Sequence, residues 1–234
     1  MEAVLAAEGL GARTRRGPIF TGVTVKAGPG EVVAVSGPGG SGRTSLLLTL
    51  AGRMRPAEGA LAVAGTSDLA RIRTRVAVAR LTGAAEPEPE LSVARHVRER
   101  CLTLRDPGAA RDFDDVREIV GLTAADGEVV RDLPDAESTR LALALALLEE
   151  PAVIVLDDLD LGADAEEQVT LWSAARRAAG AGPAVVATVT EPSPAHGLAD
   201  AFVRLEPRDF ARHEPAGSAG PTPADSAPNE GGAE

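Results

Sequence analysis

Aromatic residues and cysteine are scarce in this sequence, and each shortage excludes a class of structure. Of 234 residues, 44% are apolar but only 2% are aromatic, with no tyrosine and a single tryptophan, Trp172. A hydrophobic core must therefore be built almost entirely from aliphatic side chains. The one cysteine, Cys101, excludes an internal disulfide and a cysteine-based zinc cluster. It lies in a helical pattern, where we expect a buried or half-buried thiol.

Long apolar runs and an excess of positive charge are also missing. The longest apolar run, residues 141–148, is far shorter than the ~20 residues that cross a bilayer. The first ten residues lack the basic and apolar regions of a signal peptide. A formal net charge of −11 argues against nucleic acid as a partner, because phosphate backbones attract basic surfaces. These absences predict a cytoplasmic protein that reaches the inner face of the cell membrane only through a partner.

Strands alternate with helices along most of the chain, which indicates a parallel sheet covered on both faces. Residues 1–30 have the alternating pattern of an antiparallel β region. Further strands are predicted at 31–36, 60–65, 75–79, 153–156 and 184–188, and helices at about 44–52, 92–104, 111–121, 136–150 and 164–179. Residues 83–90 read as an acidic, proline-broken loop. Residues 207–234, rich in Pro, Ala, Gly, Ser and Glu, are predicted to be a disordered acidic tail.

A glycine-rich loop follows the strand at 31–36. Residues 37–44 read G-P-G-G-S-G-R-T and match the phosphate-loop pattern G-x-x-x-x-G-K-[ST] except at the lysine. The backbone N–H groups of such a loop cradle phosphate oxygens, and the following helix adds its positive end. The predicted nucleotide-binding residues are Gly37, Pro38, Gly39, Gly40, Ser41, Gly42, Arg43, Thr44 and Ser45.

Arg43 is the departure from that pattern. Arginine keeps the positive charge but is longer and planar, so it fits the β/γ-phosphate position poorly. The exchange alone carries limited weight, because Lys26 is the only lysine in the chain. The competing interpretation of the whole loop is an ordinary glycine-rich turn between a strand and a helix.

A second buried strand ends in a carboxylate. Residues 153–156 are apolar and Asp157 follows them, as needed to position Mg²⁺ beside phosphates. Thr44 would offer its hydroxyl to the same ion, so Thr44 and Asp157 are the predicted metal ligands. An ordinary buried strand capped by an acidic loop is the alternative. The two motifs, over 100 residues apart, occur together much less often by chance than either does alone.

With both motifs identified, residues 2–206 resemble the nucleotide-binding subunits of ATP-binding-cassette (ABC) transporters. The similarity extends over the segments Leu50–Gly59, Glu90–Val93, Arg140–Pro151, Leu161–Asp164, Leu198–Asp200 and Phe202–Leu205. It implies an α/β P-loop NTPase fold with an antiparallel β subdomain and an α-helical subdomain at about 83–135, within one domain at 1–206. It also implies Mg-ATP as cofactor, ATP or ADP as ligand, a membrane permease subunit as partner, and a homo- or heterodimer with another ABC subunit.

The family's signature, L-S-G-G-Q, is replaced here by Leu133-Pro-Asp-Ala-Glu137. The family signature holds the γ-phosphate of a nucleotide bound to the other subunit. Pro134 removes a backbone donor, and we expect Asp135 and Glu137 to face that phosphate with negative charge. Two like charges a few ångströms apart in a partly dry site cost of the order of several kcal/mol.

Other positions of family chemistry also differ. Asp158 stands where the family has the glutamate that activates water; its carboxylate falls short by ~1.5 Å, and misplacement on that scale can cost about 100-fold in rate. Val189 takes the place of the switch histidine, while His196 is expected at the surface. The glutamine that the family has near the position of Arg80 and Leu81 is absent. The position at which the family has an adenine-stacking aromatic residue aligns near Thr14.

The combined departures favour an ABC subunit that binds ATP or ADP weakly and hydrolyses ATP slowly or not at all. It would act as a regulatory or structural partner of a membrane transporter, with Asp158 a weak substitute for the catalytic glutamate. The alternative is an active ATPase subunit that energises transport. A DNA-repair or translation ATPase of the same superfamily has the least support, because its long insertions do not fit in 234 residues.

Overall fold

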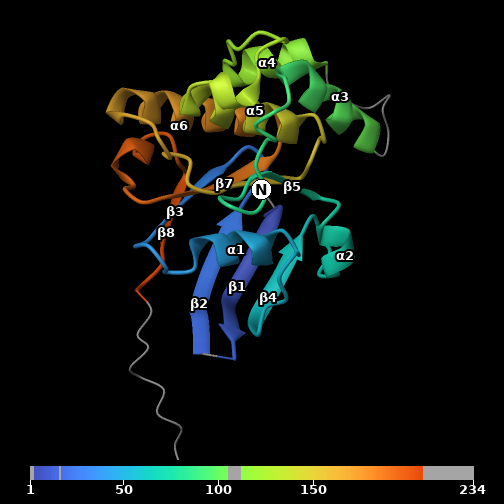
Figure 1. Cartoon of the computed structure of the whole chain (residues 1–234). Helices are drawn as coiled ribbons and strands as arrows, with labels where there is room; N and C mark the ends of the chain where they lie inside the picture. The colour runs from blue at the N-terminus through green and yellow to red at the C-terminus, as the bar shows by residue number, and fades with distance from the viewer. Residues whose placement is uncertain (1–2, 16, 105–111, 208–234) are drawn as a thin grey trace, which may run out of the picture.

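The computed structural model describes residues 3–15, 17–104 and 112–207 and contains two sheets (Figure 1). The antiparallel sheet has the order β2-β1-β4, formed by β1 (Leu5–Thr14), β2 (Gly17–Ala27) and β4 (Glu58–Val63). The parallel sheet has the order β5-β6-β7-β3-β8. Its strands are β3 (Val32–Ser36), β5 (Val76–Arg80), β6 (Val153–Leu156), β7 (Ala184–Val189) and β8 (Ala201–Arg204).

Helices lie on both sides of the parallel sheet. On one side are α3 (Val93–Thr103), α4 (Phe113–Val120), α5 (Asp135–Leu147) and α6 (Ala165–Gly180); on the other are α1 (Arg43–Leu50) and the antiparallel sheet (Figure 1). The short helix α2 (Leu69–Ile72) and the 3₁₀ turns η1 (Val130–Asp132) and η2 (Ser193–Ala195) complete the described elements. None of the helices in the described ranges is long and apolar enough to cross a membrane.

The strict alternation of side chains along buried strands produces two cores. In β3, Val32 and Ala34 point into the core shared with α4, α5 and α6, whereas Val33 and Val35 point into the core shared with α1 and the antiparallel sheet. Trp172 on α6 is fully buried in the first core, surrounded by aliphatic side chains. The expected aliphatic interior is confirmed.

The strand and helix predictions are confirmed with shifts of a few residues at their ends. The mixed architecture, one antiparallel and one parallel sheet with helices, is also as expected. Helix α2 was not predicted, because its four residues are too few to produce a periodic pattern. Beyond residue 207, the predicted tail lies outside the described residues.

Neighbouring parallel strands carry the predicted site to one edge of the sheet. β6 pairs with β7, and β7 with β3, all in parallel. Their carboxyl ends therefore meet at the same edge, where ligands bind in open α/β sheets. The glycine-rich loop follows β3, Asp157 follows β6, and Thr190 follows β7.

Candidate functional site

The glycine-rich loop connects β3 to α1, as predicted. At two of its glycines, any larger residue would clash with neighbouring atoms. A Cβ on Gly37 would lie 2.7 Å from Ser41 Oγ and 2.8 Å from the carbonyl oxygen of Leu205. Gly42 has φ 98°, and a Cβ there would meet Ile19 Cγ2 at 2.9 Å. The tight loop surrounds Ser41, whose buried hydroxyl oxygen has no hydrogen-bond partner among the described residues. Such an orphaned hydroxyl is the kind of group that a phosphate oxygen satisfies.

The two predicted metal ligands contact each other. Thr44 Oγ1 donates to Asp157 Oδ2 at 2.6 Å, and Thr188 Oγ1 donates to Asp157 Oδ1 at 2.5 Å. Asp157 is fully buried. Among the described residues, no cluster of three or more His, Cys, Asp or Glu could hold a metal by itself. A two-ligand site suits Mg²⁺, which keeps several waters and takes further ligands from phosphates.

The guanidinium of Arg43 forms hydrogen bonds and an ion pair within the protein. Nη1 donates to the carbonyl oxygens of Gly37 (2.7 Å) and Val189 (2.9 Å) and to Thr190 Oγ1 (3.3 Å). Nη2 forms an ion pair with Asp158 Oδ1 at 2.9 Å. The two side chains are only 13% and 22% exposed. One guanidinium thus joins the start of the loop to the ends of β6 and β7.

Asp158 is held at all of its polar groups. Its carboxylate accepts from Arg43 at Oδ1 and from Thr82 Oγ1 at Oδ2 (3.2 Å), and its N–H donates to Thr188 Oγ1 (2.8 Å). Its carbonyl oxygen accepts from Arg80. The backbone has φ 44°, a conformation that aspartate tolerates better than most residues. Burial raises the pKa of the Asp158 carboxyl and the adjacent Asp157 raises it further, against the opposing effect of Arg43.

Arg80 is a site residue that sequence reasoning did not identify. It ends β5 and is 5% exposed, and its guanidinium donates to Thr139 Oγ1 of α5 (2.8 Å) and to the carbonyl oxygens of Asp157 (3.3 Å) and Asp158. Burial lowers its pKa, although neighbouring carboxylates, Glu86 first among them, oppose this. Leu81, where the family glutamine was expected, is buried in the core. Arg80 ends an otherwise apolar strand, and the groups that pair with its charge come from other parts of the fold, so the sequence around β5 does not reveal them.

One expectation about the signature segment is wrong. Glu137 does not face outward toward a phosphate; it is 8% exposed and its Oε2 accepts from Thr123 N (2.7 Å) and Oγ1 (3.0 Å) and from Ala124 N (2.9 Å). Its Oε1 pairs with Arg140 at 2.5 Å. Burial alone would raise the pKa of Glu137, but these hydrogen bonds together hold it below the ordinary value. The carboxylate of Glu137 therefore points inward, where it accepts hydrogen bonds from the N–H groups of the segment after α4.

The rest of the segment stays near the surface. Pro134 is the N-cap of α5 and makes no side-chain cap, and Asp135 is an exposed residue in its first turn. The Asp135 carboxylate lies against Gly162, where a Cβ would fall 1.8 Å from Oδ2. The N-terminus of α5 is therefore covered by a negative charge from the chain itself.

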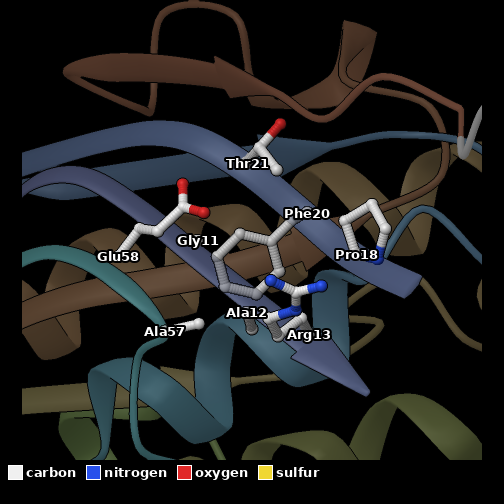
Figure 2. Close-up of a pocket in the computed structure, with 8 residues that line it drawn as sticks. All are labelled: Gly11, Ala12, Arg13, Pro18, Phe20, Thr21, Ala57 and Glu58. Carbon is white, nitrogen blue, oxygen red and sulfur yellow. The ribbon is translucent and has the colours of Figure 1, made fainter. Parts of the chain in front are cut away.

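The structure places neither a histidine at the position of the family's switch histidine nor an aromatic residue at the position that aligns near Thr14. Val189 is buried in the core, and His196 is exposed as expected, its ring 5.0 Å from that of Phe202. Thr14 ends β1 and is exposed. A hollow of about 260 Å³ lies between the end of β1 and the starts of β2 and β4 and is lined in part by Phe20, Arg13 and Glu58 (Figure 2).

Comparison with known proteins matches this architecture. The family model for ABC transporters matches residues 20–159. A probable anion import ATP-binding protein of Haloferax volcanii is 31% identical, over 84% of this chain and 75% of its own length. A putative ABC transporter ATP-binding protein of Streptomyces avermitilis is 32% identical over 86% of this chain, which spans only 36% of that relative. A nucleotide-free ATP-binding cassette has a TM-score of 0.72 at 14% identity, with 88% of each chain covered.

Proposed function

Because this chain belongs to the ABC transporter family and has the fold of its ATP-binding domain, we propose that it is a regulatory or structural ABC subunit. It binds ATP or ADP weakly and hydrolyses ATP slowly or not at all. Its partner is a membrane permease subunit, with a second ABC subunit as a homo- or heterodimer partner. It works in the cytoplasm at the inner face of the membrane.

The observation that carries this proposal is the engagement of every polar group of Asp158. Both carboxylate oxygens, the N–H and the carbonyl of this residue bond to the protein. A residue that positions attacking water must have a carboxylate oxygen within hydrogen-bond reach of that water. Each Asp158 oxygen keeps lone-pair capacity for water, but Arg43 and Thr82 both act against burial to lower the pKa of this carboxyl and so oppose its uptake of a proton. We infer that the carboxylate serves mainly the structure of the site and activates water poorly.

Arg43 weakens phosphate binding for the same reason. Its charge is already neutralised by Asp158, and its Nη1 is shared among three acceptors. A triphosphate would have to displace an ion pair that is mostly shielded from water. The gain from the new contact is offset by the loss of the old one.

Several features still support nucleotide binding. The loop amides, the orphaned Ser41 hydroxyl and the N-terminus of α1 suit a phosphate chain. We assign the role of phosphate ligands to residues 37–45 and the role of Mg²⁺ ligands to Thr44 and Asp157, which lie 2.6 Å apart. Bound Mg²⁺ would neutralise phosphate charge. The hollow at Phe20 gives a base a place beside the loop, because this ring also lies 3.4 Å from a Cβ built on Gly42.

The second surface of a composite site is also altered. Pro134 has no N–H to donate, and Asp135 lies exposed at the start of α5, where a partner's γ-phosphate would approach. Each composite site of a dimer joins one subunit's phosphate loop to the other's signature. A chain altered in both halves leaves neither site intact, even beside an intact partner.

We assign residues 1–206 to one nucleotide-binding domain with a helical subdomain at about 83–135. The packing of α4 against α5 and α6 in a single core supports a helical layer in this region. An active ATPase subunit is the second candidate function. The direct Thr44–Asp157 contact favours it, and the relatives are named as ATP-binding import or export proteins.

A steady-state ATPase assay on the purified chain tests the choice. We expect turnover at background, and we expect Arg43→Lys to leave it there, because Asp158, Val189 and the 133–137 segment remain. Calorimetric titration with ATP and ADP, with and without Mg²⁺, measures binding in parallel. Turnover of about 1 s⁻¹ or more, in the usual range of enzymes, would make the chain an active ATPase. Full recovery with Arg43→Lys would locate the defect at that residue alone.

A further inference from the structure

Positive and negative charges are divided between two parts of the sequence. The first 80 residues hold 11 lysines and arginines against 5 acidic residues, a net charge of +6. The remaining 154 residues hold 13 against 30, a net charge of −17. The total of −11 averages two parts of opposite sign. An argument from net charge therefore says little about any one surface.

Four exposed arginines gather where α1 ends and α2 lies against it, and we call them the arginine face: Arg53, Arg55, Arg71 and Arg73. The two elements touch at Gly52, where a Cβ would meet the carbonyl oxygen of Leu69 at 2.8 Å and Ile72 Cγ2 at 3.0 Å. Figure 1 shows α2 beyond the end of α1, on the side of the antiparallel sheet. Arg75 borders the face, next to the turn at 149–152.

The arginine face has few counter-charges of its own. Of its members, only Arg71 has a carboxylate within 4.0 Å in the described part of the chain, namely Asp68 at 3.8 Å, and both side chains are exposed. Six arginines after residue 80 are paired: Arg95, Arg100, Arg117, Arg131, Arg140 and Arg176. Outside the face, the exposed Arg13, Arg15, Arg98 and Arg204 also have no ion pair within the described residues. What distinguishes the arginine face is that four exposed arginines lie on two segments in contact, where together they can bind an external anion.

We propose that the arginine face binds the phosphate groups of an anionic lipid surface. A guanidinium matches phosphate with two parallel hydrogen bonds. Screening beyond about 8 Å at physiological salt keeps the acidic body of the protein from cancelling this attraction. The proposal rests on the proposed function only for bringing the chain close to a membrane. It adds a direct contact to the one made through a permease.

Nucleic acid is the other abundant polyanion, and the face does not suit it. Residues 49–75 contain no aromatic side chain, so there is no platform on which unpaired bases could stack. The face lies on a turn and a helix of four residues, too short to be the recognition helix of a groove-reading motif. Lipid phosphates need neither feature.

Vesicle flotation of the full chain tests the proposal. We expect binding to vesicles of phosphatidylglycerol mixed with phosphatidylcholine, none to pure phosphatidylcholine, and release by high salt. Each arginine near an anionic leaflet strengthens partitioning about fivefold. The double variant Arg53→Ser/Arg55→Ser should therefore bind about 25-fold more weakly. Arg95→Ser/Arg131→Ser, with the same change in charge at paired arginines, is the matched control and should bind like the parent.

Three results would overturn the proposal: no binding to anionic vesicles, an equal loss in the control variant, or binding to single-stranded RNA at a salt concentration that releases the vesicles. The fluorescence of Trp172 checks that each variant is folded. The ATPase assay reads a separate outcome. Turnover would end the proposed function without altering the vesicle result, and failure to bind vesicles would leave the nucleotide-site argument intact.

Discussion

At the scale of residues, the proposed weak binding of phosphate follows from the contacts that Arg43 makes within the protein. One terminal nitrogen of its guanidinium donates to Asp158, and the other donates to two carbonyl oxygens and a hydroxyl. Since the pair is mostly shielded from water, its attraction is stronger than that of a surface ion pair. A phosphate group would compete directly with Asp158 for the same donors.

Replacing Asp158 with asparagine should therefore tighten nucleotide binding. Asparagine keeps the size of the side chain but no longer neutralises Arg43. We expect the affinity for ATP and for pyrophosphate to rise about tenfold, equivalent to ~1.4 kcal/mol. Isothermal titration calorimetry measures both constants. Asp160→Asn removes the same charge two residues away and should change affinity less than twofold; an unchanged or weaker affinity in Asp158→Asn would refute the competition.

Some site residues could be read from the sequence and others could not. Thr44 and Asp157 follow strands whose order in a parallel sheet brings them together, so their contact was predictable. The inward turn of Glu137 was not, because it depends on N–H groups at Thr123 and Ala124 that no spacing rule identifies. The burial of Arg80 could not be predicted, because in the sequence an arginine at the end of an apolar strand cannot be told from a solvent-exposed one.

At the scale of elements, Glu137 fastens the first turn of α5 to the segment after α4. Its carboxylate satisfies two backbone N–H groups and one hydroxyl there, and it pairs with Arg140 on its own helix. Pro134 supplies no side-chain hydrogen bond at the start of the helix, so the network attaches the first turn of α5 to residues 123–124 without capping its N–H groups. At the position of the family's signature, Glu137 therefore has a structural role.

Glu137→Gln should lower stability and flatten its dependence on pH. The folded state lowers the pKa of Glu137 from its ordinary value of 4.5. Its ionised form therefore adds stability that is fully present above that value and lost as the pH falls through the lower, folded-state pKa. At pH 7 we expect the variant to be less stable by ~1–3 kcal/mol.

Urea unfolding followed by Trp172 fluorescence measures this difference across the acid range. The gap between the parent and Glu137→Gln should narrow as the pH falls. Glu99→Gln, at an exposed i,i+4 pair with Arg95, is the control and should stay within about 0.5 kcal/mol of the parent. Parallel curves for the parent and Glu137→Gln would show that the carboxylate contributes no linked protonation.

At the scale of the whole molecule, both surfaces of a composite ATP site are altered together. The phosphate loop is neutralised by an internal ion pair. The exposed start of α5 carries Asp135 and lacks an N–H at Pro134. The overall fold was predictable, because alternating strands and helices specify a parallel sheet. The separation of charge can also be counted along the sequence, although the total of −11 conceals it; which of the basic residues lie on adjoining segments is known only from the structure.

Mg-ATP should therefore fail to dimerise this chain. A γ-phosphate bound at the loop would meet negative charge on the facing subunit, at a cost of the order of several kcal/mol. Analytical ultracentrifugation with and without Mg-ATP, at a nucleotide concentration well above the measured dissociation constant, should give the same sedimentation coefficient. A nucleotide-dependent dimer would contradict the assignment of the 133–137 segment as an inactive surface.

Arg80 has a consequence for how this sequence can change over generations. It donates to Thr139 and to the carbonyl groups of Asp157 and Asp158, so its removal takes a donor from three acceptors, of which the Asp158 carbonyl keeps the N–H of Leu161. Under the proposed function, a lineage that acquired hydrolysis by exchanging one residue at a time would have to free Asp158 from Arg43 while Arg80 still fixed its backbone. The effect of each exchange would therefore depend on the exchanges before it, and their order would matter as much as their identity.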